Sequence, residues 1–327
     1  MSTQRATVPA SFFGIVLGLV GLGDCWRVAA LAWGLPSSIG EAIMLGAFGV
    51  WILLSVLYLL KWLTSSAEAL AEWRHPVQSC FVGLAPVATL LAGIAIAPHL
   101  HILAVWLIVI GAVAQLLYGI YFTAQLWSSE REIGTASPAL YLPTVAGNFV
   151  TAFCAGYLGR PDVGTLFLGA GMLSWLSLES IISNRLSFHV AIPIPLRPTM
   201  GIMLAPPAVG CVGYLFVTGG ISGGAPDLVA QLLVGYALLL LGLLARLMPW
   251  VVHQPFTAGY WAFSFGITAL AFDTIVFVIR GLRGGLMEWL SIGLLIFATT
   301  VIVALIIGTV RLLVRGKLLP PPLISSV

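Results

Sequence analysis

The sequence predicts an all-α membrane protein with ten transmembrane helices, and its composition gives the main reasons. Hydrophobic residues make up 60% of the 327 positions, and a further 36 residues are glycine. Charged residues make up 8%, against roughly 25% in an ordinary soluble domain. At about 20 apolar residues per span, this composition supplies roughly ten spans. It excludes a soluble globule, a disordered chain and a nucleic-acid-binding protein, which needs a dense basic surface.

Ten apolar runs, separated by polar or Pro/Gly-rich segments, give the predicted helices in chain order. They lie at 12–34, 41–62, 79–98, 102–127, 139–159, 163–184, 199–218, 228–248, 258–279 and 286–313. Their length and their lack of a period-2 alternation exclude the strands of a membrane β-barrel. The odd-numbered runs begin about 60 residues apart, a period that predicts five stacked helical hairpins. The loops are too short to fold alone, so we expect one transmembrane domain over residues 1–327.

The first run carries small residues and two charges. Gly14, Gly18 and Gly21 share one helix face, which favours either close helix packing or an open lumen. Asp24 and Arg27 lie three residues apart and are neighbours on the same helix. They form either a self-neutralised pair or a proton or substrate site.

The fifth run has one polar face, formed by residues at spacings of three and four. These residues are Tyr141, Thr144, Asn148 and Thr151. Such a face either lines water or forms hydrogen bonds to a neighbouring helix. In the sixth run, Glu179 lies near the cytoplasmic helix end, where snorkelling or pairing with Arg246 satisfies its charge.

Prolines interrupt several odd-numbered runs. They are Pro86, Pro143, Pro206 and Pro207. A proline inside a helix removes a hydrogen bond and bends the helix, whereas a proline in the first turn costs little. The second, fourth, sixth and tenth runs have no interior proline, so we predict different roles for odd and even helices.

Asp273 lies inside the ninth run, at a depth similar to that of Arg27 in the first. At 1.5 Å per residue, each lies about 23 Å from the cytoplasmic end of its helix. The first and ninth helices are neighbours in a closed ring of five hairpins. We therefore expect Arg27 to pair with Asp24 or Asp273 near the outer end.

The lysine and arginine residues are concentrated on one side of the predicted membrane. Of the 14 such residues, the other side holds Arg27, Arg160, Arg280 and Arg283. The rest, Arg5 and Arg131 among them, lie on the side that holds both termini. The positive-inside rule therefore places both termini in the cytoplasm. No A-x-A cleavage site follows the first run, so we expect a retained span rather than a signal peptide.

No residue pattern points to catalysis. The five histidines lie in loops or at helix ends, where they cannot hold a haem between facing helices. The four cysteines lie inside apolar runs, which argues against a disulfide framework or a zinc site. Residues 220–224 match G-x-S-x-G, but no strand precedes them. We expect no catalytic residue, no metal ligand, no cofactor and no enzymatic activity.

Several short blocks occur in an order that resembles one family of membrane proteins. The blocks are 13–15 (FGI), 75–77 (HPV), 141–143 (YLP), 148–149 (NF), 169–172 (GAGM), 199–202 (TMGI), 246–250 (RLMPW) and 261–266 (WAFSFG). They resemble the tellurite-resistance/dicarboxylate transporter family, which is also similar to the plant guard-cell slow anion channels. The likeness extends over nearly the whole chain.

The resemblance implies an architecture and a gate. Odd helices ring a central pore, even helices form an outer ring, and protomers assemble as a homotrimer with one pore each. A phenylalanine on the ninth helix, here Phe265, blocks a narrow and largely uncharged channel. The pore-lining positions are Gly14, Gly18, Thr144, Asn148 and Gly201. Val16, Asp24 and Asp273 depart from the family's pattern, which has proline at the first position and uncharged residues at the others.

These observations predict a passive channel for small monovalent anions, such as chloride or nitrate, in a bacterial inner membrane. The alternative is a proton-coupled exporter of dicarboxylate, sulfite or tellurium oxyanions, with Asp24 or Asp273 carrying the proton. A structural or signalling membrane protein without flux is a third possibility. Inorganic or carboxylate anions and the lipid bilayer are the expected partners, and nucleic acid is not.

Overall fold

The computed structural model describes residues 7–130 and 133–320, and within these ranges it contains helices and no strands. Its ten candidate membrane spans confirm the predicted number of transmembrane helices. The odd-numbered spans are Ala10–Trp33, Gln78–Ile96, Pro138–Tyr157, Ile194–Val217 and Ala258–Ile279. Arg5 and Arg131, used above for the orientation, lie outside the described residues.

Each even-numbered span is one continuous α-helix of 24 to 30 residues. These helices are α2 (Ser37–Thr64), α6 (His101–Ser128), α8 (Pro161–Phe188), α10 (Leu228–Val251) and α12 (Gly285–Val314). At 1.5 Å per residue, even the shortest crosses a hydrocarbon core of about 30 Å. Two of them, α2 and α8, begin two or more residues earlier than predicted. Pro36 directly precedes α2, and Pro161 opens α8, where its missing N–H costs no helical hydrogen bond.

Each odd-numbered span is divided into two or three helical segments, and the division lies towards the membrane side on which α1 begins. The segments are η1 (Ala10–Phe12) and α1 (Phe13–Trp33); α4 (Gln78–Val82) and α5 (Leu84–Ile96); η3 (Pro138–Leu140), η4 (Leu142–Ala146) and α7 (Gly147–Tyr157); η5 (Ile194–Leu204) and α9 (Ala205–Val217); η7 (Ala258–Phe263) and α11 (Ser264–Ile279). Outside the spans lie α3 (Ser66–Arg74), η2 (Ile133–Thr135) and η6 (Gly220–Ser222). Helix α3 lies between the predicted runs 41–62 and 79–98, where the sequence pattern predicts no helix.

The prolines lie at these breaks rather than in the middle of α-helices. Pro86, Pro206 and Pro207 occupy the first turn of α5 or α9, where a missing N–H is tolerated. Pro143 lies in η4, a π-helical turn. There the side chain of Gln115 in α6 donates a hydrogen bond to the Pro143 carbonyl (2.6 Å). Pro143, Pro206 and Pro207 therefore lie where the helix type changes, whereas Pro86 follows a break between the two α-helices α4 and α5.

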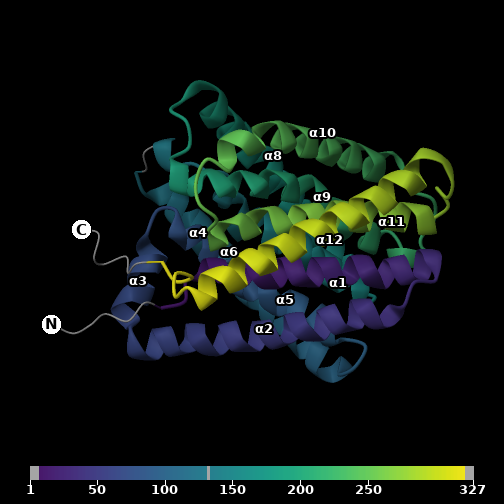
Figure 1. Ribbon diagram of the computed structural model, residues 1–327, viewed down its shortest axis with the longest axis horizontal. Coiled ribbons are helices and arrows are strands. Elements are labelled where there is room, and N and C mark those ends of the chain that lie inside the picture. Colours follow the sequence, from purple (N-terminus) through teal and green to yellow (C-terminus); the bar gives the residue numbers. More distant parts are fainter. Residues whose placement is uncertain (1–6, 131–132, 321–327) are drawn as a thin grey trace.

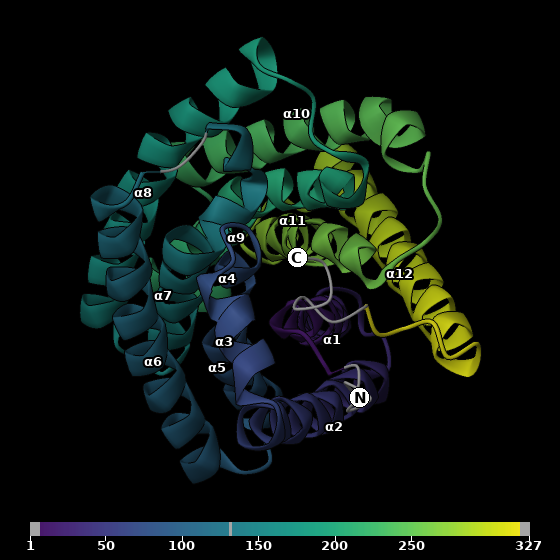
Figure 2. The ribbon, with the colours of Figure 1, turned by 90° about the vertical axis from the view of Figure 1, so that its left-hand side faces the viewer.

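The odd helices form an inner ring and the even helices surround them (Figure 2). In the most apolar stretch of each odd span, 61% to 83% of the residues are buried, against 17% to 39% in the even spans. The packing order closes on itself: α1 contacts α5, α5 contacts α7, α7 contacts α9, α9 contacts α11, and α11 contacts α1. Each inner helix also packs against the even helix that follows it. The start of α1 and the end of α12 lie on the same side (Figure 1).

Candidate functional site

A small cavity lies where the five inner helices meet. Its volume is about 20 Å³, which is room for about one water molecule. The wall is formed by Gly21 and Asp24 of α1, Leu91 of α5, Phe153 of α7, Val209 and Val212 of α9, and Phe265, Thr268, Ala269 and Phe272 of α11. The axis of the inner ring is therefore narrow at this depth and mostly apolar.

Phe265 reaches this cavity from the first turn of α11. Its side chain is half-buried, and it lies beside Gly21 of α1. A Cβ atom added at Gly21 would lie 3.4 Å from Cδ2 of the Phe265 ring. The ring thus contacts a part of α1 that has no side chain. Sequence reasoning selected Phe265 through the family resemblance, and the fold places it at the meeting point of the inner helices.

The glycines selected from the sequence have different surroundings. Gly18 packs against the side chain of Ser264, so a Cβ atom there would overlap α11. Gly201 is buried against Phe263 in the same way. At Gly14, an added Cβ atom would lie 4.0 Å from its nearest neighbours, which is an ordinary contact. Gly18 and Gly201 therefore serve close packing between inner segments.

Asp24 projects into the cavity one helical turn beyond Gly21. Its Oδ1 lies 3.9 Å from Nη1 of Arg27, which confirms the expected ion pair between the two residues. The closer partner of Arg27 is Glu41 of α2, with Nε–Oε1 at 2.7 Å and Nη2–Oε2 at 2.9 Å. The guanidinium also donates to the carbonyls of Ile94 and Ala95 in the last turn of α5. Arg27 therefore joins α1, α2 and α5.

Glu41 and His99 extend this charged cluster towards the outer end of the helices. Nε2 of His99 lies 2.8 Å from Oε2 of Glu41, and the His99 side chain is 43% exposed. Neither residue was predicted as part of the site. The sequence could have indicated Glu41 through its position. It follows the short turn after the first helix, and it therefore lies at the same membrane depth as Arg27.

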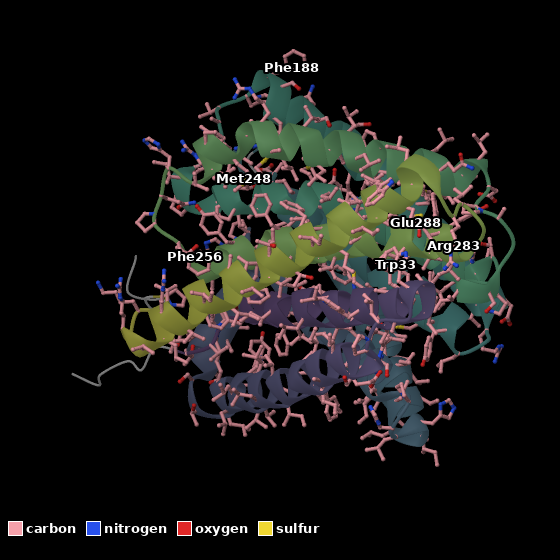
Figure 3. The ribbon with its side chains drawn as sticks, turned by 45° about the vertical axis from the view of Figure 1, so that its right-hand side comes forward. Trp33, Phe188, Met248, Phe256, Arg283 and Glu288 are labelled. Carbon is pink, nitrogen blue, oxygen red and sulfur yellow. The ribbon has the colours of Figure 1, made fainter. Side chains whose placement is uncertain are left out.

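A second polar cluster fastens the end of α1 to the α11–α12 turn (Figure 3). Nε1 of Trp33 donates to Glu288 (3.1 Å), and the Glu288 carboxylate also accepts from the Gly284 N–H (2.7 Å). Arg283 donates to the carbonyl of Ala32. These contacts hold the first and fifth hairpins together at the outer end, on the side of the molecule opposite Phe256 and Met248.

Thr144 and Asn148 lie apart from the cavity around Phe265. They line a groove of about 610 Å³ between α6 and α8, together with Gln115 and Pro143. The side chain of Asn148 donates to the Thr144 carbonyl (2.6 Å), so its amide compensates the irregular backbone of η4. Asn148 thus bonds within its own span. Tyr141 of the same polar face donates to Glu179 of α8, which is the bond to a neighbouring helix that was one of the two roles considered.

Glu179 holds three segments together. Its Oε2 accepts hydrogen bonds from Tyr141 (2.6 Å) and from Trp175 of α8 (2.9 Å), and its Oε1 accepts one from Tyr236 of α10 (3.2 Å). These donors stabilise a carboxylate at membrane depth without a cation. The partners of Glu179 are therefore hydroxyl and indole groups, whereas Arg246 is exposed.

Asp273 is fully buried in α11 and faces the Cys211 thiol of α9. It does not line the cavity around Phe265. Within residues 7–130 and 133–320, no group of three His, Cys, Asp or Glu residues is arranged to hold a metal ion. The cysteines of the described residues are buried and form no disulfide.

His75, from the HPV block, has a structural role before α4. Its Nδ1 accepts hydrogen bonds from the N–H groups of Val77 and Gln78, both at 3.1 Å. Burial lowers the pKa of His75, which agrees with a ring nitrogen that must stay unprotonated to accept these bonds. The block therefore starts the third span rather than forming part of the cavity.

Residues 7–310 match the model of the voltage-dependent anion channel family. The chain belongs to this family. Membership confirms the resemblance inferred from the sequence blocks and places the protein among multi-pass membrane anion channels and transporters, not among enzymes. The chain with this inner ring and narrow cavity thus belongs to a family whose description names an anion channel.

Two relatives illustrate the range of the family. The tellurite resistance protein TehA homolog of Haemophilus influenzae is 34% identical over 316 residues, covering 96% of this chain and 94% of that protein. The guard cell S-type anion channel SLAC1 of Arabidopsis thaliana is 24% identical over 316 residues, covering 92% of this chain and 55% of that protein. The chain therefore spans nearly all of the bacterial relative and about half of the plant channel.

Proposed function

We propose that the protein is a passive channel for small monovalent anions such as chloride or nitrate, with its pathway along the axis of the inner ring and Phe265 as the gate. The observation that carries this proposal is the cavity of about 20 Å³, to which all five inner helices contribute and into which Phe265 projects. A constriction that holds about one water molecule excludes a hydrated ion.

The lining of the cavity supports weakly hydrated monovalent anions as the substrates. Its wall consists mainly of aliphatic and aromatic side chains, so an anion must lose most of its water to pass. The edge of a phenyl ring is slightly positive, so Phe265 repels an anion less than a carbonyl does. No Lys or Arg is among the described lining residues, which disfavours dianions, because they need stronger compensation for lost hydration.

The orientation and assembly belong to the same proposal. Both termini face the cytoplasm of a bacterial cell, the membrane is the inner membrane, and the protomers form a homotrimer with one pathway each. The weakly buried even helices support this arrangement, because they leave a large apolar surface for lipid and for neighbouring protomers.

The gate is tested by replacing the ring. We expect Phe265→Ala to raise chloride or nitrate flux in proteoliposomes at least about tenfold, equivalent to ~1.4 kcal/mol off the barrier. Its thermal stability should change little, because the ring is half-buried beside a glycine. Phe149→Ala is the matched control: Phe149 is fully buried and packs against Trp175. This variant should lose stability without gaining flux.

The result for Phe265→Ala also separates the gate from a packing residue. A variant that conducts like the parent but melts several degrees lower would make Phe265 a packing residue.

A reversal potential that follows the anion gradient alone, under an imposed pH gradient, supports the passive channel. A reversal potential that shifts with the pH gradient supports the coupled exporter.

A further inference from the structure

Asp24 is an unexpected residue for an anion pathway. Among the described residues that line the cavity around Phe265, it alone carries an ionisable carboxyl group. Its side chain is 15% exposed, and it lies one turn from Gly21, whose backbone lies beside the Phe265 ring. The carboxyl group is therefore next to the gate, on the side towards Arg27 and the outer end of α1.

Arg27 does not cancel the charge of Asp24. Two hydrogen bonds join its guanidinium to Glu41, and two more join it to the Ile94 and Ala95 carbonyls. The contact with Asp24, at 3.9 Å, is longer than any of these. Since Glu41 already neutralises Arg27, an ionised Asp24 leaves a net negative charge beside the cavity.

Apart from His99, which is a cation only when protonated, the other groups around Asp24 supply no second cation. The titratable or charged groups that face Asp24 or its partners are Cys25 and Arg27 of α1, Glu41 of α2, Cys154 and Tyr157 of α7, and His99, which contacts Glu41. From α5 and α9 the neighbours in the cavity are the apolar Leu91, Val209 and Val212. The acid of α11, Asp273, faces Cys211.

The protonation state of such a carboxyl group controls an anion in the cavity. An ionised carboxylate repels an anion, and the low dielectric of a nearly dry constriction strengthens the repulsion. A protonated carboxyl group has no charge, and its O–H is a hydrogen-bond donor for an anion that has lost its water. Asp24 therefore acts as a barrier in one form and as an anion ligand in the other.

We propose that Asp24 is the proton-binding group of the anion pathway and that anions pass Phe265 only while Asp24 is protonated. This inference rests on the proposed channel function. Flux should then rise on acidification, although the proton remains on the protein and does not travel with the anion.

The test compares chloride flux in proteoliposomes at mildly alkaline and mildly acidic pH, in the Phe265→Ala background so that the gate is open. With Asp24 intact, we expect flux to rise at least about tenfold on acidification. Asp24→Asn should give a high flux at both pH values, because the amide is a neutral donor of the same size. Asp24→Leu should remove the pH dependence as well, and it covers the case in which the amide variant folds poorly.

Two control variants assign the pH dependence to Asp24. Asp273→Asn changes the other buried acid of the inner ring, and His99→Ala removes the histidine of the outer cluster. Both should keep the rise on acidification. A pH dependence that survives in Asp24→Asn, or that disappears in either control, would overturn the assignment.

The outcomes separate this inference from the proposed function. A large flux that does not change with pH in Phe265→Ala leaves the channel intact and overturns the role of Asp24. No anion flux from Phe265→Ala at either pH overturns the proposed channel, and the inference with it.

Discussion

At the scale of single residues, Arg27 shows how one charged group is stabilised inside the membrane. Its guanidinium has five N–H donors in a planar fork, and the structure uses them on a carboxylate of α2 and on two backbone carbonyls at the end of α5. Carbonyls at a helix end have no partner within the helix. Arg27 therefore satisfies groups that would otherwise be unpaired, while Glu41 neutralises its charge.

Removing Glu41 tests this account. We expect Glu41→Ala to lower the free energy of unfolding by about 1–3 kcal/mol, because it leaves a largely buried guanidinium with only part of its partners. Thermal unfolding in detergent measures the loss. Asp162→Ala is the matched control, since the Arg160–Asp162 pair (2.9 Å) is 64% exposed at both residues and solvent screening leaves such surface pairs with little effect on stability. Equal shifts in both variants would contradict the prediction.

The residues of the candidate site were predictable to different degrees. Phe265 and Asp24 were accessible, one through a sequence block and the other because a charge inside an apolar run is conspicuous. Glu41 and His99 were missed because they lie near helix ends, where charged groups are common and carry little information. Thr144 and Asn148 showed their polar spacing, but spacing gives a helix face and not the neighbour that this face contacts.

At the scale of elements, the contact between α1 and α11 closes the inner ring. Gly18 and Gly21 lie one turn apart and face Ser264 and Thr268, with no space for a side chain on α1. Backbone packing this close increases dispersion contacts, which drive helix association where lipid competes with apolar side chains. The small residues of the first span are therefore used mainly for helix packing at this contact.

A glycine pair distinguishes packing from intrinsic helix preference. Gly18→Ala should lower the free energy of unfolding by about 1–3 kcal/mol, because the new methyl group overlaps Ser264 in a packed interior. Gly46→Ala in α2 meets no atom within 4 Å, so it should be neutral or should stabilise by up to about 1 kcal/mol. Thermal unfolding of the two variants gives the comparison. A loss of similar size at both positions would show that the α1–α11 contact is not the cause.

The sequence predicted the continuous even helices but not the form of the breaks in the odd spans, and the reason is physical. An outer helix such as α12 needs only a long apolar run, which composition reveals. An inner segment such as η4 depends on Gln115, which reaches it from α6 and bonds to Pro143, and on Gly147, where an added side chain would overlap that glutamine. This partner is distant in the sequence, so the prolines revealed that the span is irregular without revealing how.

At the scale of the whole molecule, the two rings follow from where the apolar surface is satisfied. The outer helices expose large aliphatic side chains along their length, among them Leu59, Leu117, Leu166, Leu239 and Val303. Such a surface requires lipid or another protomer around it. The inner helices contain breaks, prolines and the charged Asp24, and irregular backbone at membrane depth is tolerated only where protein or a cavity surrounds it. Interior prolines thus point to the inner helices before any contact is known, with Pro249 of α10 as an exception. Charges do not separate the two rings, because Glu179 lies in the outer helix α8.

The cations on the side away from the chain ends are all engaged with protein groups. Arg27 binds Glu41, Arg160 binds Asp162, Arg280 donates to the Leu215 and Gly220 carbonyls, and Arg283 donates to the Ala32 carbonyl. These interactions reduce the positive charge that this side offers to solvent or lipid headgroups. On the opposite side, Lys61, Arg185 and Arg197 are engaged with protein groups as well. The proposed orientation therefore rests on the residue counts alone.

Reporter fusions test this orientation. Green fluorescent protein attached after Val327 should fluoresce, since it folds in the cytoplasm, and alkaline phosphatase at the same position should be inactive. Phosphatase inserted after Gly224, a turn position where an added Cβ atom would meet no neighbour within 4 Å, should be active because it reaches the oxidising side that its disulfides require. Active phosphatase at Val327 together with inactive phosphatase at Gly224 would reverse the orientation. It would also place Asp24 and the His99–Glu41 pair on the cytoplasmic side of Phe265, so that internal rather than external acidification would control flux.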